Sequence, residues 1–193
     1  YVGFRCVKDV APLVKSQQWC TTNLCTALTD TSQSTCYDAS TILTCPDTAG
    51  ADTCSSSNFC GQDAQYTSTI MSLYTEDVSG EIVVHDNNTG LIWQATQSDN
   101  LDWDTAVAYC NTLSYGGATP GSWRLPSLHE LLSIIDYSGV SPTIDSTMFP
   151  DATDATFWSA TATEVMIDTY RDVAFYDGGS GWTGKVATTL SAR

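Results

Sequence analysis

Basic residues are scarce in this chain. Its 193 residues include seven Lys and Arg against 22 Asp and Glu, so the formal net charge is −15. A surface of this charge repels nucleic acids, anionic lipids and sulfated glycans. The sequence also lacks an apolar run long enough to cross a bilayer. These absences predict that the protein has no nucleic-acid partner and does not insert into a membrane.

The short motifs that mark common catalytic sites are missing as well. There is no G-x-S-x-G elbow, no H-E-x-x-H pair, no P-loop and no Rossmann glycine pattern. His129 lies next to Glu130 in a predicted helix, where a surface position is expected. Ser180 lies between two glycines and is expected in a turn, not as a nucleophile. The sequence therefore predicts a protein that is not an enzyme.

Cysteine, by contrast, is plentiful. No C-x-x-C pair occurs, and the two histidines are not spaced as zinc ligands beside cysteines. An even number of Cys in an acidic, Ser- and Thr-rich chain indicates disulfides and an oxidising compartment, so we expect a secreted or cell-surface protein. The eight residues are Cys6, Cys20, Cys25, Cys36, Cys45, Cys54, Cys60 and Cys110. The local pairs expected are Cys20–Cys25, Cys36–Cys45 and Cys54–Cys60, one arrangement out of on the order of a hundred.

Three zones follow one another along the chain. Residues 1–8 alternate aromatic or aliphatic residues with others, as a β-strand does. Residues 9–62 hold six of the eight Cys among Thr, Ser, Asp and Asn, and have few large apolar residues. We interpret this zone as a connector that local disulfides hold together. Residues 63–193 are predicted to form a globular domain.

The globular zone begins with a hairpin and two helices. Turn-forming residues 86–90 separate the β-prone runs 81–85 and 91–94. A helix is expected after Asp102, its N-cap, and a second helix after Pro126. The first has an apolar face of Trp103, Ala106, Val107, Cys110 and Leu113, and the second has a Ser127–Glu130 capping box and an apolar face of Leu128, Leu131, Leu132 and Ile135.

After Ser138 the pattern changes to short β-prone pieces. These are 156–160, 170–176 and 184–190, and a Gly-rich turn over 177–181 separates the last two. Helices that are separate along the chain from antiparallel strands indicate an α+β fold. Trp93, Trp103, Trp123 and Trp158 are all expected in the core.

Two features of the loop-rich region suit a ligand. Asp145, Asp151 and Asp154 cluster there, and carboxylates on such loops suit Ca²⁺, although their spacing matches no defined calcium loop. Trp182 lies in the expected Gly-rich turn and is the best candidate for an exposed aromatic ligand platform. The Glu-Pro-Asn and Trp-Asn-Asp sugar signatures of calcium-dependent lectins are absent. A glycan site would therefore be of a different kind.

The globular zone resembles the C-terminal domain of Lcl-type bacterial collagen-like adhesins. The similar stretches are GQDAQY at 61–66, DNNTGLIWQ at 86–94, LDWDTAVAYCNTLSYGG at 101–117, WRLPSLHELLSIID at 123–136, FWSAT at 157–161 and AFYDGG at 174–179. The resemblance implies a C-type-lectin-like fold with two helices, antiparallel sheets and long loops. Family members usually end in a strand with an Arg-Cys-Val-Arg-like tetrapeptide. This chain carries Arg5-Cys6-Val7-Lys8 at its start instead. The sequence GFRCV at 3–7 is also similar to the end of sulfatase-modifying domains.

The same resemblance implies a disulfide from the first helix to the closing strand. In this chain that bond would join Cys110 to Cys6. The distribution of cysteines agrees, because Cys110 is the only one in the globular zone and Cys6 stands apart from the three local pairs. The reactive cysteine pair of formylglycine-generating enzymes has no counterpart here, so that activity is not implied.

The position of the closing strand leaves several arrangements open. Residues Tyr1, Val2, Gly3, Phe4, Arg5, Cys6 and Val7 either return to their own domain, as in a circular permutation, or enter a neighbouring copy. Alternatively, Arg193 and Tyr1 are joined in a tandem array, or the chain is an excised portion of a longer secreted product. Donation to a neighbour predicts a structural subunit or repeat of a bacterial surface filament, a head-to-tail homopolymer. The alternative function is a lectin-like adhesion module that binds a glycan or a surface protein.

Overall fold

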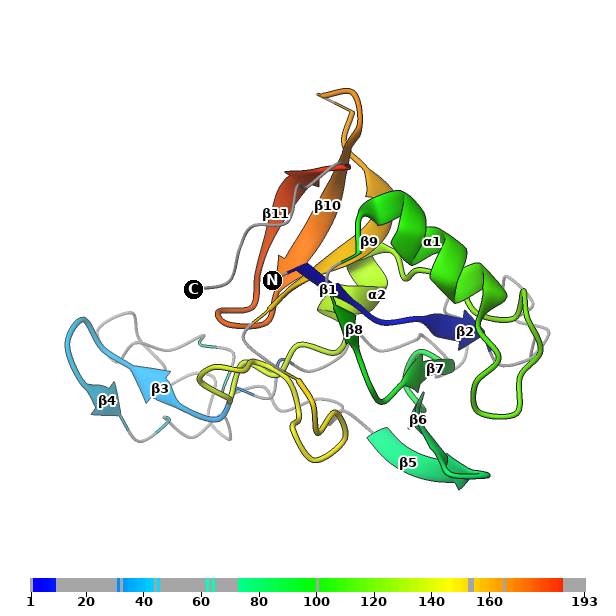
Figure 1. The fold of residues 1–193 in the computed structure, drawn as a ribbon. Coiled ribbons are helices and arrows are strands. Elements are labelled where there is room, and N and C mark those ends of the chain that lie inside the picture. Colours follow the sequence, from blue (N-terminus) through cyan, green and yellow to red (C-terminus); the bar gives the residue numbers. More distant parts are fainter. Residues whose placement is uncertain are drawn as a thin grey trace, which may run out of the picture.

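A computed structural model gives the fold of the chain. It describes residues 2–9, 31, 33–43, 45, 62, 64, 73–99, 101–152, 155–164 and 166–185. The strands are β1 (Val2–Phe4), β2 (Val7–Asp9), β3 (Cys36–Tyr37), β4 (Ile42–Leu43), β5 (Leu73–Val78), β6 (Glu81–Asp86), β7 (Leu91–Gln94), β8 (Ser98–Asp99), β9 (Thr156–Ala162), β10 (Thr169–Ala174) and β11 (Gly179–Gly184). The helices are α1 (Trp103–Thr112) and α2 (Leu128–Leu132) (Figure 1). This mixture of largely antiparallel sheets and two helices confirms the α+β class.

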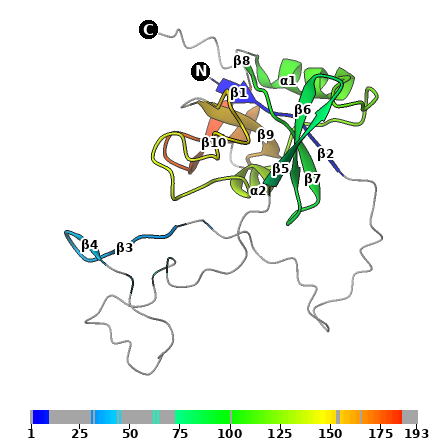
Figure 2. The same cartoon turned by 90° about the horizontal axis from the view of Figure 1, so that it is seen from below.

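The strands form two principal sheets. The first has the order β11-β10-β9-β1-β8 and the second has the order β2-β7-β6-β5. Pairing is antiparallel throughout except between β1 and β9, which run parallel. A third, two-stranded sheet of β3 and β4 carries the predicted Cys36–Cys45 disulfide. Figure 2 shows this small hairpin apart from the two principal sheets.

The N-terminal segment belongs to both principal sheets. Gly3 of β1 pairs with Asp99 of β8 on one side and with Phe157 of β9 on the other. Val7 of β2 pairs with Trp93 of β7 in the other sheet. The sequence predicted one continuous strand over residues 1–8, and that prediction was wrong in one respect. The strand is interrupted at Arg5 and Cys6, and Figure 1 shows the dark blue segment passing from one sheet to the other.

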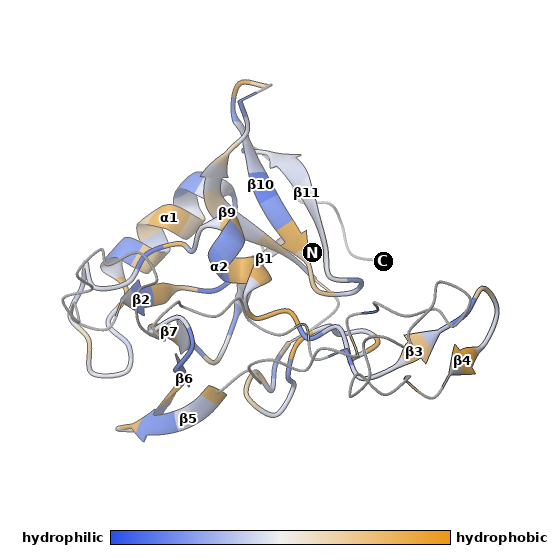
Figure 3. Cartoon of the chain, turned by 180° about the vertical axis from the view of Figure 1, so that it is seen from behind, coloured by the Kyte–Doolittle hydropathy of each residue, from blue (hydrophilic) through white to orange (hydrophobic). Residues whose placement is uncertain are grey.

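Both helices begin where their capping residues predicted. The Asp102 side chain accepts a hydrogen bond from the Thr105 N–H at 2.8 Å. Ser127 and Glu130 form the reciprocal capping box at the start of α2. Each cap satisfies backbone N–H groups that have no partner within the first helical turn. In Figure 3 both helices carry apolar and polar residues, as expected for helices that cover a core with one face.

Two groups of buried apolar residues lie under these elements. One contains Phe149, Phe157 and Phe175 together with residues of α2, and Phe157 and Phe175 meet edge to face at 4.8 Å. The other lies beneath α1 and includes the disulfide. Trp93, Trp123 and Trp158 are each at most 1% exposed, as predicted, and Trp103 is partly buried and stacked on Tyr170. In the described part of the chain, no helix is long and apolar enough to span a bilayer.

The last described strand differs from its prediction. A turn was expected over 177–181 and a strand over 184–190, but β11 begins at Gly179 and ends at Gly184. Ser180, expected in a turn, lies in this strand opposite Val173 of β10. Glycine and serine are turn-forming residues in isolation, whereas here the ladder with β10 holds them extended. Residues 186–190 lie outside the described residues.

Candidate functional site

The candidate site is the place where residues 5–8 lie between the two principal sheets. Cys6 and Cys110 of α1 form the disulfide that the family resemblance implied, with their Cα atoms 5.5 Å apart. Both residues are fully buried. The bond ties the N-terminal segment to the buried face of α1 in the last turn of that helix. Every cysteine in the described part of the chain is in a disulfide.

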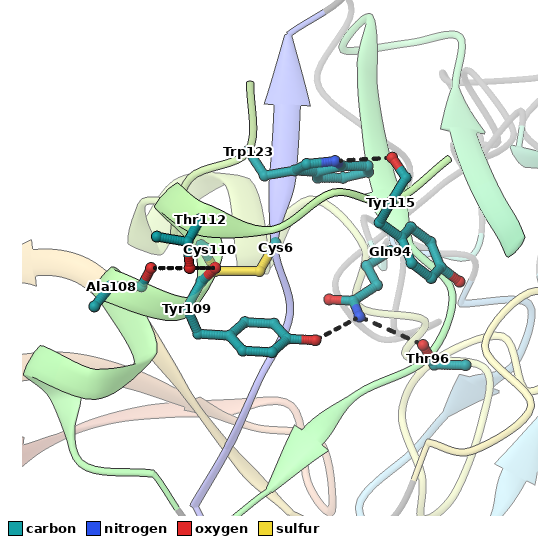
Figure 4. Close-up of a disulfide and its surroundings, with 9 residues drawn as sticks. All are labelled: Cys6, Gln94, Thr96, Ala108, Tyr109, Cys110, Thr112, Tyr115 and Trp123. Atoms are coloured by element: carbon teal, nitrogen blue, oxygen red, sulfur yellow. Dashed lines mark hydrogen bonds between the residues drawn. A yellow bond between two sulfur atoms is a disulfide. The ribbon is translucent and has the colours of Figure 1, made fainter. Parts of the chain in front are cut away.

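Hydrogen bonds enclose this disulfide. The Gln94 N–H donates to the Cys6 carbonyl at 3.1 Å, which extends the β2–β7 pairing by one residue. The buried Gln94 side chain donates to Thr96 and Tyr109 hydroxyls, each at 3.5 Å. Figure 4 shows these groups around the sulfur atoms, with the Trp123 indole donating to the Tyr115 carbonyl nearby. At Cys6 the segment is therefore held by a main-chain hydrogen bond as well as by the covalent bond.

Arg5 is a fully buried cation. Its Nη2 pairs with Asp151 Oδ1 at 3.0 Å, and its Nη1 donates to the carbonyls of Gln94 and Ala95. The guanidinium carbon lies 4.7 Å from the centre of the Phe149 ring, a cation–π contact. A buried charge is tolerated only when it is paired and hydrogen-bonded, and these partners meet that requirement.

Val7 and Lys8 complete the set of anchored residues. Val7 of β2 and Arg124, which lies outside the named strands, exchange backbone hydrogen bonds, both at 2.9 Å. The ammonium group of Lys8 lies 5.2 Å from the centre of the Trp123 ring. Each residue of the tetrapeptide thus has its own partner. Arg5 has a carboxylate, Cys6 a disulfide-bonded cysteine, Val7 the backbone of Arg124 and Lys8 an indole.

Arg124, the backbone partner of Val7, also contacts the first turn of α2. Arg124 holds the Glu130 carboxylate with two hydrogen bonds of 2.9 and 2.8 Å. Burial alone would raise the pKa of Glu130, but the hydrogen bonds from Arg124 and Ser127 outweigh it and lower that pKa below its ordinary value of 4.5. Glu130 also closes the capping box of α2. Arg124 therefore links the start of this helix to Val7 of the N-terminal segment.

The other predicted site residues lie elsewhere or have other partners. Asp151 uses Oδ1 for Arg5 and accepts the Gln97 N–H on Oδ2 at 2.6 Å. Asp145 caps the backbone of Thr147 and Met148. Asp154, Tyr1 and the predicted pairs Cys20–Cys25 and Cys54–Cys60 lie outside the described residues. Within the described part of the chain, no three His, Cys, Asp or Glu side chains are grouped as metal ligands.

Trp182 is exposed, although it lies in β11 and not in a turn. Its exposed fraction is 53%, and it borders a shallow depression beside the turn between β10 and β11. Sequence reasoning did not find Asp151 as the partner of Arg5, nor Arg124 and Trp123 as partners of Val7 and Lys8. Only the family resemblance pointed at the tetrapeptide that they surround.

Comparison with known families decides what kind of domain this is. The profile of the Lcl C-terminal domain family matches residues 82–193. The chain belongs to the Lcl C-terminal domain family. The matched range begins within β6, so it contains Cys110, Arg124 and Asp151 but not the N-terminal segment that contacts them. No curated protein and no solved structure matches the chain.

Proposed function

We propose that this Lcl C-terminal domain protein is an extracellular structural subunit of a bacterial surface filament. In this proposal the domain has a C-type-lectin-like fold and no enzymatic activity. Residues 2–9 of one copy complete the sheets of the next, and a Cys6–Cys110 bond between the two copies locks each junction.

One observation carries the proposal. The segment 2–9 enters the first sheet between β8 and β9 and also pairs with β7 of the second sheet. Residues 10–72 separate it along the chain from β5, the first strand of the remaining body. A segment that is remote in sequence and fills an interior place in a sheet can come from the same chain or from a second copy. In the structure the segment and the sheets that it completes belong to one chain, and donation would form the same pairings between two copies.

Donation of such a segment has a defined consequence for assembly. The donating segment and the receiving site are different surfaces, so the contact is heterologous. Heterologous contacts that do not close into a ring extend into a fibre. A donated strand gains main-chain hydrogen bonds along its length, and here a buried cation and a disulfide would add to them. Asp9 is part of β2, so residues 10–62 of the predicted connector would then bridge successive domains.

The first experiment uses wild-type protein secreted into an oxidising compartment. On a non-reducing gel, donation predicts a ladder of multimers that collapses to one band on reduction. A Cys6→Ser/Cys110→Ser double variant is the matched control and should give no ladder through this bond. Wild-type protein that runs as a sharp monomer with and without reductant would overturn strand donation.

A second experiment identifies the bond in any ladder. Cys6→Ser chains keep Cys110, and Cys110→Ser chains keep Cys6, so neither variant can form the bond alone. Co-expression of the two should give a reducible heterodimer, and peptide mapping should find Cys6 of one chain joined to Cys110 of the other. If co-expression gives only monomers with both thiols unpaired, the segment closes on its own domain.

A second candidate function is a lectin-like adhesion module that binds a glycan or a surface protein. The observation that favours it is the exposed Trp182 beside the depression at the β10–β11 turn. This function does not require donation, because no described residue of the N-terminal segment lines the depression. The two functions are compatible in one filament that displays a binding site on each subunit.

A further inference from the structure

The hairpin of β9 and β10 ends in a loop that carries two exposed apolar side chains. Met166 is 42% exposed and Ile167 is 93% exposed. Figure 1 shows this end of the hairpin projecting beyond the start of α1. Single apolar side chains scattered over a surface need no explanation, but a cluster of them at a projecting end marks a contact surface. The groups beside these two residues decide what this surface binds.

The loop is held in one conformation by its own hydrogen bonds. The Thr163 N–H donates to the Thr169 carbonyl at 3.0 Å, and the Thr169 hydroxyl donates to the Met166 carbonyl at 2.9 Å. Asp168 has a φ of +56°, and its carbonyl accepts the Lys185 N–H at 2.7 Å. The apolar side chains are therefore presented on a fixed turn, which lowers the conformational cost of a contact.

The same end of the sheet carries a cation and an indole on one face. Arg171 of β10 pairs with Trp182 of β11, so both side chains lie on the face of the sheet opposite to that of Asp172. Trp182 is 53% exposed. The hydrogen bond between Lys185 and Asp168 places the end of β11 against the loop. We call the following residues the tip patch: Glu164, Met166, Ile167, Arg171 and Trp182.

Two opposite charges in the tip patch have no partner within the described part of the chain. The other described basic residues each have an ion pair or an aromatic ring contact: Arg5, Lys8, Arg124 and Lys185. Arg171 has neither among the described residues, because the nearby Asp172 carboxylate lies on the other face and accepts hydrogen bonds from Gly181 and Thr183. The exposed Glu164 side chain likewise has no ion pair or hydrogen bond to a described residue.

A reciprocal contact between two copies satisfies both charges. We propose that the tip patch binds the tip patch of a second copy across a twofold axis. Glu164 of each copy then pairs with Arg171 of the other, and Ile167 of each packs against Trp182 of the other. In a twofold contact one patch serves both sides, so each pairing occurs twice. Trp and Arg are also residue types on which binding energy concentrates at interfaces.

The composition of the tip patch favours a second copy over a partner of one charge. The patch combines a carboxylate, a guanidinium and apolar side chains, so it is complementary to itself. The net charge of −15 opposes association of two copies at low salt. At about 0.15 M salt the Debye length is about 8 Å, so charges outside the contact are largely screened. Only the charges within the patch then decide the pairing.

This contact goes beyond strand donation and does not rest on it. It uses no residue of the segment 2–9 and no cysteine. Two self-closed monomers would form a dimer through it, and two filaments would be joined side by side. The covalent ladder and the tip contact can therefore be measured independently.

Sedimentation velocity tests the contact with the full chain in its disulfide-bonded form. The sample is the smallest covalent species on a non-reducing gel, at about 0.15 M salt. We expect its average mass to rise with protein concentration. Ile167→Ser should weaken this association by about tenfold or more. Val140→Ser is the matched control and should leave it unchanged, because Val140 is 94% exposed in a different loop.

Charge reversal tests the reciprocal geometry. Arg171→Glu and Glu164→Arg should each weaken association of the variant with itself by about tenfold or more, because each places two like-charged pairs in the contact. An equal mixture of the two variants should associate about as well as wild type, since one original pair and one reversed pair then form. A folding defect in either variant would not be repaired by mixing.

Three results would overturn the proposal. One is a wild-type mass that stays constant up to about 1 mM protein. Another is association that Ile167→Ser and Arg171→Glu leave unchanged, which would assign it to a different surface. The third is a mixture of the charge variants that associates no better than either variant alone. Thermal unfolding of each variant checks that the domain is intact, and the non-reducing gel reports strand donation separately.

Discussion

Removal of the charge of Asp151 should destabilise the domain more than removal of its partner Arg5. Asp151→Asn leaves a fully buried guanidinium without its counter-ion, whereas Arg5→Met replaces that cation with an apolar side chain that can remain buried. Loss of one member of a buried pair costs about 3–5 kcal/mol. The Asp151 side chain is 36% exposed, so we expect the lower end, about 3 kcal/mol.

The cost of Arg5→Met comes from different contacts. The carbonyls of Gln94 and Ala95 lose a charged donor, and the remaining Asp151 can turn toward water because it is partly exposed. One lost hydrogen bond of this kind costs about 1–2 kcal/mol. The double variant Arg5→Met/Asp151→Asn should then be about as stable as Arg5→Met alone. Any remaining difference in unfolding free energy between the double variant and Arg5→Met reports the changed hydrogen bond from the Gln97 N–H to residue 151.

Urea unfolding of the disulfide-intact protein measures all four free energies in this cycle. Tryptophan fluorescence reports the transition, because Trp93, Trp123 and Trp158 are buried. The reasoning requires a coupling of at least about 1 kcal/mol between positions 5 and 151. A result in which Arg5→Met costs more than Asp151→Asn, with additive effects, would show that packing around residue 5 matters and its charge does not.

Three further predictions concern the disulfide, one glycine and one carboxylate. In the self-closed monomer, a Cys6→Ala/Cys110→Ala variant should lose about 4–5 kcal/mol, since the bond joins residues 104 apart in one chain and closes a long loop in the unfolded state; a loss below about 1 kcal/mol in urea unfolding of the monomer would contradict this. Gly181→Ala should cost about 1–3 kcal/mol because its Cβ would approach a carboxylate at 2.8 Å, whereas Gly184→Ala in the same strand meets nothing within 4 Å and serves as the control in thermal melts. The folded-state pKa of Glu130 is lowered, so its ionised form stabilises the fold above the ordinary value of 4.5, and that stabilisation disappears as the pH falls through the lowered pKa. The stability difference between wild type and Glu130→Gln should therefore shrink on acidification from about pH 6 to about pH 3, and a constant difference would refute the pKa direction.

The proposed filament junction and the depression beside Trp182 use different residues of the same domain. The covalent junction uses Cys6 and Cys110, which are buried. The depression is lined by residues of β10, β11 and their turn and by Thr156 of β9, which pairs with Val2 of the N-terminal segment. A variant at Trp182 should therefore leave the covalent ladder unchanged. A variant at Cys6 likewise tests assembly without touching the depression. Either proposal, strand donation or ligand binding at the depression, can therefore be refuted by experiment without refuting the other.

Local sequence determined the parts of this fold that depend on near neighbours in the chain. The start of α1 at Asp102 and the capping box of α2 follow from hydrogen bonds between residues three apart. The β6–β7 hairpin follows from turn residues between two β-prone runs. β-Structure was correctly predicted for residues 2–4 and 7–8 but not for the interruption at Arg5 and Cys6. The pairing of Cys6 with Cys110 followed from the family resemblance together with the distribution of cysteines.

Only the tertiary structure decided how distant residues share one site. The interruption of the N-terminal strand at Arg5 and Cys6 reflects two partners, Asp151 and Cys110, that lie more than a hundred residues away. The glycine-rich residues of β11 are extended because β10 supplies a ladder for them, which outweighs their preference for turns. Such pairings depend on the closure of long loops, and short-range propensity carries no information about which remote residue arrives. For this reason the sequence identified the anchoring tetrapeptide through its family, whereas its carboxylate, indole and backbone partners emerged only from the fold.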